Sequence, residues 1–224
     1  VGELVALVGV FLEIGAGVSP ITPQTRHVVY TDLSETAAEE IQRKHDAEKV
    51  IAMSATDLCF KSEVATAVVC SEVLEHVAND RKALGEIYRV LKPNGSLFLT
   101  LPVHSYWYTV DDVFVKHLRR YDPKALTKTL EGLGFTEIRL IKLTGLLDKL
   151  AMILAVLFFK FFSVFKFCRS SNQKKNPGLR TFLIAAYRVL NRAYGFLVRL
   201  EASIIPFGWA TIVLFQCKKG NKCL

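Results

Sequence analysis

The sequence lacks several features that would mark a secreted, zinc-binding or membrane-spanning protein. Its five cysteines form no Cys-x-x-Cys pair, which argues against a disulfide framework and a zinc knuckle and favours a reducing, cytosolic environment. The apolar run Leu150–Phe159 is ten residues long, well short of the roughly 20 that cross a bilayer. The chain opens with Val1, and no small-residue cleavage site follows its first apolar run. We therefore expect neither a signal peptide nor a native start at residue 1.

Acidic residues are almost absent from one long segment. Between Leu146 and Leu200, ten lysines and arginines accompany Asp148 alone, although the formal net charge of the whole chain is only +8. The remaining residues are therefore close to neutral, and the basic segment predicts a localised anionic surface as partner. Its charges are interleaved with Phe, Leu and Ile, and the sequence contains no recognisable RNA-binding module. We expect an anionic membrane surface and no nucleic acid.

The sequence does contain a regular alternation of short apolar runs and helical patterns. Strands are expected at Leu7–Ile14, Val28–Asp32, Val50–Met53, Thr66–Ser71, Ser96–Leu101, Glu137–Lys142 and Trp209–Cys217, and helices at Glu35–Asp46, Asn79–Leu91 and Pro123–Glu131. This order indicates an α/β, Rossmann-like fold with a mainly parallel seven-stranded sheet and helices on both faces. A length of 224 residues with 51% hydrophobic residues fits one such domain with an elaboration.

Three motifs at the ends of expected strands suit a ligand that carries ribose and adenine. Gly15 and Gly17 follow the first strand, where they let the backbone approach a ligand closely, and Glu13 can hold a cationic amino group. Asp32 ends the second strand, where a carboxylate can accept both hydroxyls of a ribose. Asp57 follows the third strand, in position to meet an adenine amino group.

Two further motifs follow in order, Val69–Val77 (VCSEVLEHV) and Glu86–Gly95 (EIYRVLKPNG). With them the sequence resembles the class I methyltransferases, and within these the type 11 group that includes the ubiquinone and menaquinone methyltransferases. The resemblance runs from about Val10 to Leu143 and resumes at Trp209–Lys218, and the combination of motifs is far more specific than any one of them. It implies S-adenosylmethionine as the cofactor.

The resemblance also implies which residues bind this cofactor. They are Glu13, Gly15 and Gly17 in the turn, Asp32 with Leu33 at the ribose, Asp57 with Leu58 around the adenine, and Ser71, Glu72 and Val73 at the methionine end. Glu75 and His76 are interpreted as helical and structural. Ser19 and Pro20 stand where the family pattern has its third glycine. Ser19 can cap and Pro20 can open a short helix that must end before His27.

Two other classes of protein remain open. A nicotinamide-dependent dehydrogenase also has a glycine turn and an acid after the second strand. It predicts glycine at Pro20 and gives no reason for Ser71–His76 or Lys92–Gly95. A membrane-bound binding module that keeps the fold without turnover fits Ser19, Pro23 and the near absence of helical residues ahead of the first strand.

The methyl acceptor is expected after the fourth and fifth strands, because open parallel sheets bind ligands at the carboxyl ends of their strands. The candidate catalytic residues are His104, His117, Arg120 and Tyr121, and the candidate substrate-binding residues are Tyr106, Trp107, Tyr108 and Arg119. Either histidine could deprotonate an acceptor oxygen, and the arginines could hold an anionic group. In the alternative interpretation the aromatic residues cover the sheet and the arginines face solvent. Asp111, Asp112 and His117 make no closed ligand set, so no metal is expected. O-methylation is expected, with C-methylation of a quinone-like ring as the alternative.

The last expectation concerns an insertion, residues 146–206, between the sixth and seventh strands. It divides the methyltransferase domain into residues 1–145 and 207–218, ahead of a tail at 219–224. In its second half Arg180, Arg188, Arg192 and Arg199 share one helix face, and Phe182, Ala186, Val189, Leu190, Ala193, Tyr194 and Leu197 share the opposite face. We expect the insertion to lie at the interface of a membrane on its cytoplasmic face, where the enzyme methylates a lipid or lipid-linked acceptor. A helical pair packed on the sheet or in a homodimer is the alternative.

Overall fold

The computed structural model describes residues 9–22, 27–45, 49–166 and 177–221, and of His45, residues 159–166 and residues 177–190 it describes the backbone only. The strands are β1 (Phe11–Ile14), β2 (Val28–Asp32), β3 (Val50–Ala52), β4 (Ala65–Ser71), β5 (Leu91–Pro102), β6 (Phe135–Thr144) and β7 (Ile212–Lys219). The helices are α2 (Glu35–His45), α3 (Asp80–Val90), α4 (Val110–Phe114), α5 (Pro123–Leu133), α6 (Leu146–Lys166) and α7 (Pro177–Ile204). Short 3-10 turns form at η1 (Leu74–His76), η2 (Ser105–Trp107) and η3 (Phe207–Trp209).

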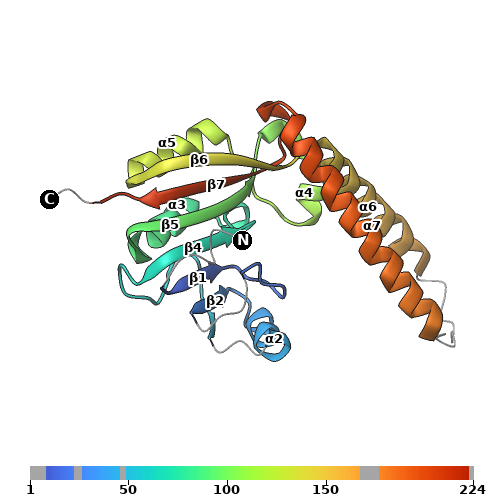
Figure 1. Cartoon of the computed structure of the whole chain (residues 1–224), viewed down its shortest axis with the longest axis horizontal. Helices are drawn as coiled ribbons and strands as arrows, with labels where there is room; N and C mark the ends of the chain where they lie inside the picture. The colour runs from blue at the N-terminus through green and yellow to red at the C-terminus, as the bar shows by residue number, and fades with distance from the viewer. Residues whose placement is uncertain (1–8, 23–26, 46–48, 167–176, 222–224) are drawn as a thin grey trace.

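The strands form one sheet in the order β3-β2-β1-β4-β5-β7-β6 (Figure 1). The pairs from β3 to β5 are all parallel, whereas β7 is antiparallel to both β5 and β6. The mainly parallel, Rossmann-like sheet predicted from the sequence is therefore confirmed. Its carboxyl ends from β1 to β5 all meet at one edge, which is where such sheets bind ligands.

Helices cover both faces because apolar residues occupy successive positions of the inner strands. In β1, Leu12 and Ile14 pack into the core that also contains the buried sides of α3 and α5, whereas Phe11 packs with Ile41 of α2 on the other face. As predicted, Asp122 caps α5: its carboxylate accepts the amide hydrogen of Ala125. The helices thus cover the two faces of the sheet, and the carboxyl ends of the strands remain accessible to a ligand.

Two elements differ from the prediction because short-range signals were misleading. The strand β5 begins at Leu91, directly after α3, although Lys92–Gly95 has the composition of a turn. The helix α4 occupies a segment for which no helix was predicted. Its start is fixed by a capping box, in which the amide of Thr109 donates to the carboxylate of Asp112.

The predicted helix at Ser19 and Pro20 does not form at those residues. Residues 15–22 make a turn and bends, and no described residue between β1 and β2 is helical. The rest of that expected helix, at 23–26, and the first residues of the expected first strand, Leu7 and Val8, lie outside the described residues.

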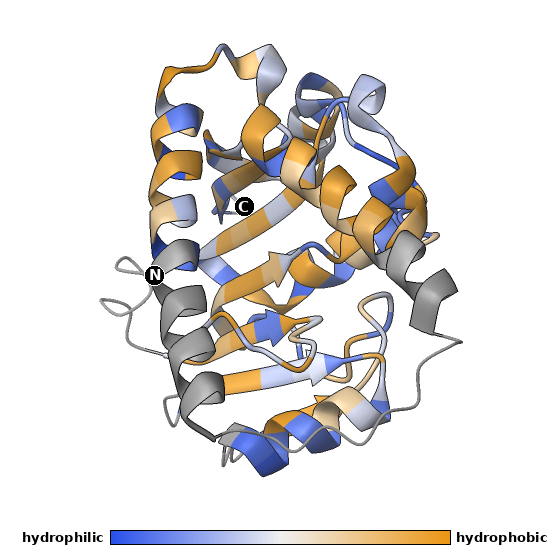
Figure 2. Cartoon of the chain, turned by 90° about the vertical axis from the view of Figure 1, so that its right-hand side faces the viewer, coloured by the Kyte–Doolittle hydropathy of each residue, from blue (hydrophilic) through white to orange (hydrophobic). Residues whose placement is uncertain are grey.

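The insertion consists of α6 and α7, which project from the sheet beside β6 (Figure 1). The two helices are joined near their sheet ends, where the amide of Leu147 donates to both carboxylate oxygens of Glu201, at 3.0 and 3.1 Å. There too the Tyr194 hydroxyl donates to Asp148, at 2.9 Å. Elsewhere Figure 2 shows the helices apart. Among the described residues, no helix combines the length and apolar character needed to span a bilayer.

Candidate functional site

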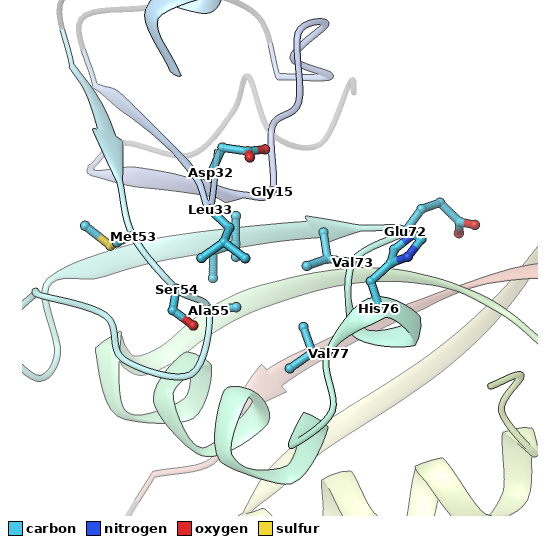
Figure 3. Close-up of a pocket in the computed structure, with 11 residues that line it drawn as sticks. Gly15, Asp32, Leu33, Met53, Ser54, Ala55, Glu72, Val73, His76 and Val77 are labelled. Carbon is cyan, nitrogen blue, oxygen red and sulfur yellow. The ribbon is translucent and has the colours of Figure 1, made fainter. Parts of the chain in front are cut away.

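A cavity of about 230 Å³ lies at the carboxyl ends of β1 to β4, and we call it the strand-end pocket (Figure 3). It is lined by Ile14, Gly15, Asp32, Leu33, Met53, Ser54, Ala55, Glu72, Val73, His76 and Val77. Four strands thus contribute one or more residues each, as expected for a nucleotide-type ligand in an open parallel sheet.

The turn after β1 depends on the absence of a side chain at Gly15. This residue has φ +68°, and a Cβ atom there would lie 2.3 Å from a methyl carbon of Val73. Next to it, Asp32 accepts hydrogen bonds from the amides of Gly17 and Ser34, both at 2.8 Å. These bonds fix the carboxylate of Asp32 in the pocket wall, where the sequence predicted a ribose contact.

Glu13 has a different role from the one predicted. Its side chain is buried, and its two oxygens accept hydrogen bonds from the amides of Ile21 and Thr22, at 2.8 and 2.9 Å. The Thr22 hydroxyl donates to it as well. Glu13 therefore holds the loop after the glycine turn, and it does not line the pocket in which it was expected to hold an amino group.

Asp57 and Leu58, predicted to contact the adenine, do not line the strand-end pocket. The amide of Asp57 donates to the carbonyl of Ser54 at 3.1 Å, and this turn leaves Asp57 exposed and Leu58 buried. Ser54 and Ala55, directly after β3, line the pocket instead. The position of the strand end, rather than the charge on Asp57, was the signal for these two lining residues.

At the methionine end, Glu72 and Val73 line the pocket as predicted, and Ser71 does not. The Ser71 hydroxyl lies 2.6 Å from that of Thr100 on β5. Glu72 has φ +52°, a left-handed conformation that is uncommon for a residue with a side chain. Burial raises the pKa of Glu72, although Thr100 and nearby positive charges oppose this shift.

A second cavity, of about 330 Å³, adjoins the first, and we call it the insertion-side pocket. Glu72 and His76 line both pockets. The other lining residues are Pro102, Asp111, Val115, His117, Arg120, Asp148, Lys149, Met152, Thr211 and Ile212. Helix α6 of the insertion therefore forms one wall of a pocket that opens beside the strand-end pocket.

A buried charge cluster organises this wall around Asp112. Its carboxylate accepts hydrogen bonds from His117 Nδ1 and Arg120 Nε, both at 2.8 Å, and from Lys149 Nζ at 2.7 Å. Burial alone would raise the pKa of Asp112, but these bonds hold it well below its usual range. Arg120 also donates to the carbonyls of Val103 and Thr211 and is 4% exposed, so its guanidinium is fixed in place.

Of the predicted catalytic residues, His117 and Arg120 line the insertion-side pocket, and Tyr121 does not. Tyr121 is buried, and its hydroxyl donates to the carbonyl of Leu74 and to Asp80, at 3.0 and 2.9 Å. Burial and Asp80 raise its pKa far above the usual range, so the Tyr121 hydroxyl keeps its proton. Arg119, predicted to bind substrate, forms an ion pair with Asp80 at 3.0 Å.

The remaining predicted residues, His104, Tyr106, Trp107 and Tyr108, line neither pocket. The His104 and Tyr106 rings stack at 5.0 Å, and the Tyr106 hydroxyl donates to the carbonyl of Gly208. The indole of Trp107 lies 6.5 Å from that of Trp209. His104, Tyr106 and Trp107 thus join the loop after β5 to the segment after α7. The Tyr108 hydroxyl instead donates to the carbonyl of His117, at 2.8 Å.

Sequence reasoning missed His76, which was interpreted as structural. Its helical setting is confirmed, because it ends η1, but its ring reaches both pockets. Burial and the nearby His117 lower its pKa, which favours a neutral imidazole. The spacing of Glu72, Glu75 and His76 was the available signal, because such positions fall on one face of a helical turn. Burial and Glu72 raise the pKa of Glu75 to about 8.

Comparison with known proteins agrees with this geometry. Residues 12–99 match the family described as a methyltransferase domain. An uncharacterized methyltransferase-like protein of Schizosaccharomyces pombe is 32% identical over 108 residues, which cover 46% of this chain and 40% of that protein. A demethylmenaquinone methyltransferase of Streptomyces avermitilis is 30% identical over 116 residues, which cover 50% of this chain and 50% of that protein.

Among solved structures, phosphoethanolamine N-methyltransferase 2 of Haemonchus contortus, in complex with S-adenosyl-L-methionine, has the same fold. Its TM-score is 0.60 at 17% identity, and the match covers 98% of this chain and 51% of that chain. The sheet order and the strand-end pocket are those of the class I methyltransferase fold, and the matched domain, residues 12–99, is a methyltransferase domain. The similarity to the type 11 group of these enzymes covers residues 12–99, which is less than half of the chain. It spans about half the length of the curated relatives that it matches.

Proposed function

We propose that the protein transfers a methyl group from S-adenosylmethionine to an oxygen of a lipid or lipid-linked acceptor, at the cytoplasmic face of a membrane. The observation that carries the proposal is the junction of the two pockets at Glu72 and His76. A cofactor in the strand-end pocket is adjacent to an acceptor in the insertion-side pocket. Lys149 and Met152 of α6 line that second pocket, so the insertion takes part in acceptor recognition.

The chain supplies groups that suit oxygen methylation. S-adenosylmethionine supplies an electrophilic methyl group. The guanidinium of Arg120 gives the pocket wall a fixed positive charge for an anionic acceptor. His117 is held by Asp112 through Nδ1, and this leaves Nε2 to accept the acceptor proton. C-methylation of a quinone-like ring is the second candidate, and the named acceptor of the demethylmenaquinone methyltransferases is a quinone of this kind.

Exposed apolar side chains on α4, on the residue Leu118 and on both insertion helices support a lipid surface as partner. On α4 and just after it they are Val113, Phe114 and Leu118. On the insertion they are Leu150, Leu154 and Leu157 of α6 and Phe196, Leu197, Leu200 and Ile204 of α7. Figure 2 shows hydrophobic residues along the described parts of both insertion helices. Arg192 and Arg199 are exposed beside them, whereas the side chains of Arg180 and Arg188 lie outside those described. Apolar side chains with interleaved basic ones suit an anionic bilayer surface.

The test uses S-adenosylmethionine with a radioactive methyl group, the full chain and a total lipid extract in anionic vesicles. We expect the protein to sediment with these vesicles and label to enter the organic phase. Label only in water-soluble products, from protein that remains in the supernatant, contradicts a lipid acceptor and favours a homodimer with a soluble substrate. Cofactor binding by calorimetry without any transfer favours the binding module.

A further inference from the structure

A fully buried carboxylate lies between the two pockets without a hydrogen-bond partner. Glu75 is 0% exposed, and within the described residues neither of its carboxylate oxygens accepts a hydrogen bond. Nε2 of His117 lies 3.7 Å from Oε1 of Glu75, which is longer than a hydrogen bond. Nearby, Oε1 of Glu72 is also buried and without a partner. Buried carboxylates are unfavourable unless a cation compensates them, so this arrangement points to a positive ion.

Two histidines beside Glu75 have their ring protons fixed on the same atom. Nδ1 of His117 lies 2.8 Å from Oδ1 of Asp112, and Nδ1 of His76 lies 3.2 Å from the carbonyl oxygen of Lys116. Carboxylate and carbonyl oxygens only accept, so both Nδ1 atoms donate and both neutral rings keep the lone pair on Nε2. Metal-bound histidines commonly show this arrangement.

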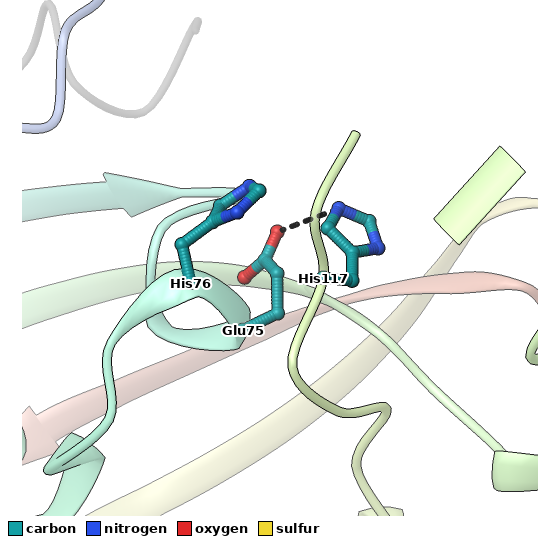
Figure 4. Close-up of side chains that lie close together, drawn as sticks. All are labelled: Glu75, His76 and His117. Atoms are coloured by element: carbon teal, nitrogen blue, oxygen red, sulfur yellow. Dashed lines mark ion pairs between the residues drawn. The ribbon is translucent and has the colours of Figure 1, made fainter. Parts of the chain in front are cut away.

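We propose that Glu75, His76 and His117 bind a divalent transition-metal ion (Figure 4). One ligand atom from each of the three residues lies within 4.8 Å of the others. Ligands of a tetrahedral ion lie about 3.4 Å apart, so small side-chain movements complete the site. Two imidazoles with a carboxylate favour an ion such as Zn²⁺ or Fe²⁺ over Mg²⁺.

This set differs from the metal ligands that were considered, and rejected, from the sequence. There Asp111 and Asp112 were paired with His117. In the structure Lys149 Nζ lies 2.8 Å from Asp111 and 2.7 Å from Asp112, so both carboxylates already have a cation. Asp112 instead orients His117 from behind, while Glu75 and His76 approach its other nitrogen.

The position of the site suggests its part in the reaction, and this step rests on the proposed function. Because His76 and Glu72 line both pockets, an ion here contacts an acceptor placed beside the methyl donor. The ion binds the acceptor hydroxyl and lowers its pKa, so that the proton passes to water. The oxygen then bonds to the methyl carbon as the bond between that carbon and sulfur breaks, and S-adenosylhomocysteine leaves. With the ion bound, Nε2 of His117 is a metal ligand, so water takes the acceptor proton in place of this imidazole.

Metal binding is tested directly on the full chain after removal of metals with a chelator. Co²⁺ is titrated while its visible absorption is followed, and Zn²⁺ is then added to displace it. We expect one ion per chain, and affinity more than about tenfold weaker in Glu75→Gln and in His117→Gln. Asp57→Asn changes an exposed carboxylate that lines neither pocket, and should keep the wild-type affinity. Glutamine has nearly the same shape and size as Glu75, so the folding of Glu75→Gln, checked by circular dichroism, should be retained.

Wild-type protein that binds neither ion, or Glu75→Gln protein that binds as tightly as wild type, overturns the proposed site. S-adenosylmethionine binding, measured by calorimetry on the metal-free chain, reports on the proposed function separately. Metal-free protein that transfers methyl groups at the full rate overturns the part given to the ion, while the methyltransferase function stands. Bound metal with no transfer to any acceptor contradicts the proposed function and leaves the metal site intact.

Discussion

At the scale of single residues, the strand-end pocket is shaped by backbone contacts more than by charges aimed at a ligand. Gly15 lets the chain pass Val73, and Glu13 is used entirely to hold the following loop. Asp32 binds two amides and still lines the pocket. It is therefore the carboxylate best placed to contact the ribose.

The first prediction is that Asp32→Ala weakens S-adenosylmethionine binding by about 1–3 kcal/mol, because bonds to the ribose and to the turn are lost together. Isothermal titration calorimetry measures the change. Asp57→Ala is the control, since that side chain is exposed and lines neither pocket. Equal affinity in the two variants would show that the ribose lies elsewhere.

The second prediction compares two adjacent arginines. Arg120 is 4% exposed and bonded to buried Asp112, so Arg120→Gln should lower the free energy of unfolding by about 3–5 kcal/mol. Arg119 forms a partly exposed pair with Asp80, and Arg119→Gln should cost less than about 1 kcal/mol. Urea denaturation of both variants measures the difference. Similar losses would mean that the cluster around Asp112 does not stabilise the fold.

At the scale of elements, Lys149 is the main connection between α6 and α4. Its ammonium group is 3% exposed and bonded to both Asp111 and Asp112. The two elements are far apart in sequence, yet together they form one side of the insertion-side pocket. The position of α6 relative to the pocket therefore depends on this ion pair.

The third prediction is that Lys149→Met loosens α4. Two buried carboxylates lose a cation, which costs about 3–5 kcal/mol, and each 1.4 kcal/mol is about tenfold in an opening equilibrium. Amide hydrogen exchange in residues 110–114 should accelerate more than about tenfold. Lys82→Met, at an exposed position of α3, serves as the control. Unchanged exchange in α4 would contradict a supporting role for Lys149.

These elements also show how much of the fold could be predicted from the sequence. The strands and the helices α2, α3 and α5 follow from periodic apolar patterns and caps, which are local. The pairing of Asp112 with Lys149 joins positions 37 residues apart, and no local pattern contains it. Tyr121 and His104 were predicted to be catalytic from the chemistry of their side chains. Their hydrogen bonds to backbone carbonyls far away in the sequence could not be predicted, for the same reason.

At the scale of the whole molecule, charge and apolar surface occur together on the insertion. Arg192 and Arg199 are exposed on α7, close to exposed Phe196 and Leu197. The other faces of the protein carry basic residues as well, for example Arg43 on α2. We therefore expect the position of the basic residues, rather than the total charge of the protein, to determine which face binds a bilayer.

The fourth prediction is that the double variant Arg192→Gln, Arg199→Gln binds anionic vesicles less tightly by about 1 kcal/mol for each charge removed. Added salt should weaken wild-type binding, because exposed charges are screened. Cosedimentation across a salt series measures both effects. The matched control is Arg43→Gln with Lys61→Gln, which removes two exposed charges outside the insertion. Equal weakening in both double variants would argue for binding by overall charge.

The place of β7 in the sheet has a consequence for the order of folding. This strand follows the insertion in the sequence but lies between β5 and β6. Until it is synthesised, β5 and β6 cannot be joined, and each presents an open edge to which foreign strands can add. The insertion helices leave the ribosome during this interval. A bilayer that captures them early would keep the two unfinished parts of the sheet close together until β7 closes the gap.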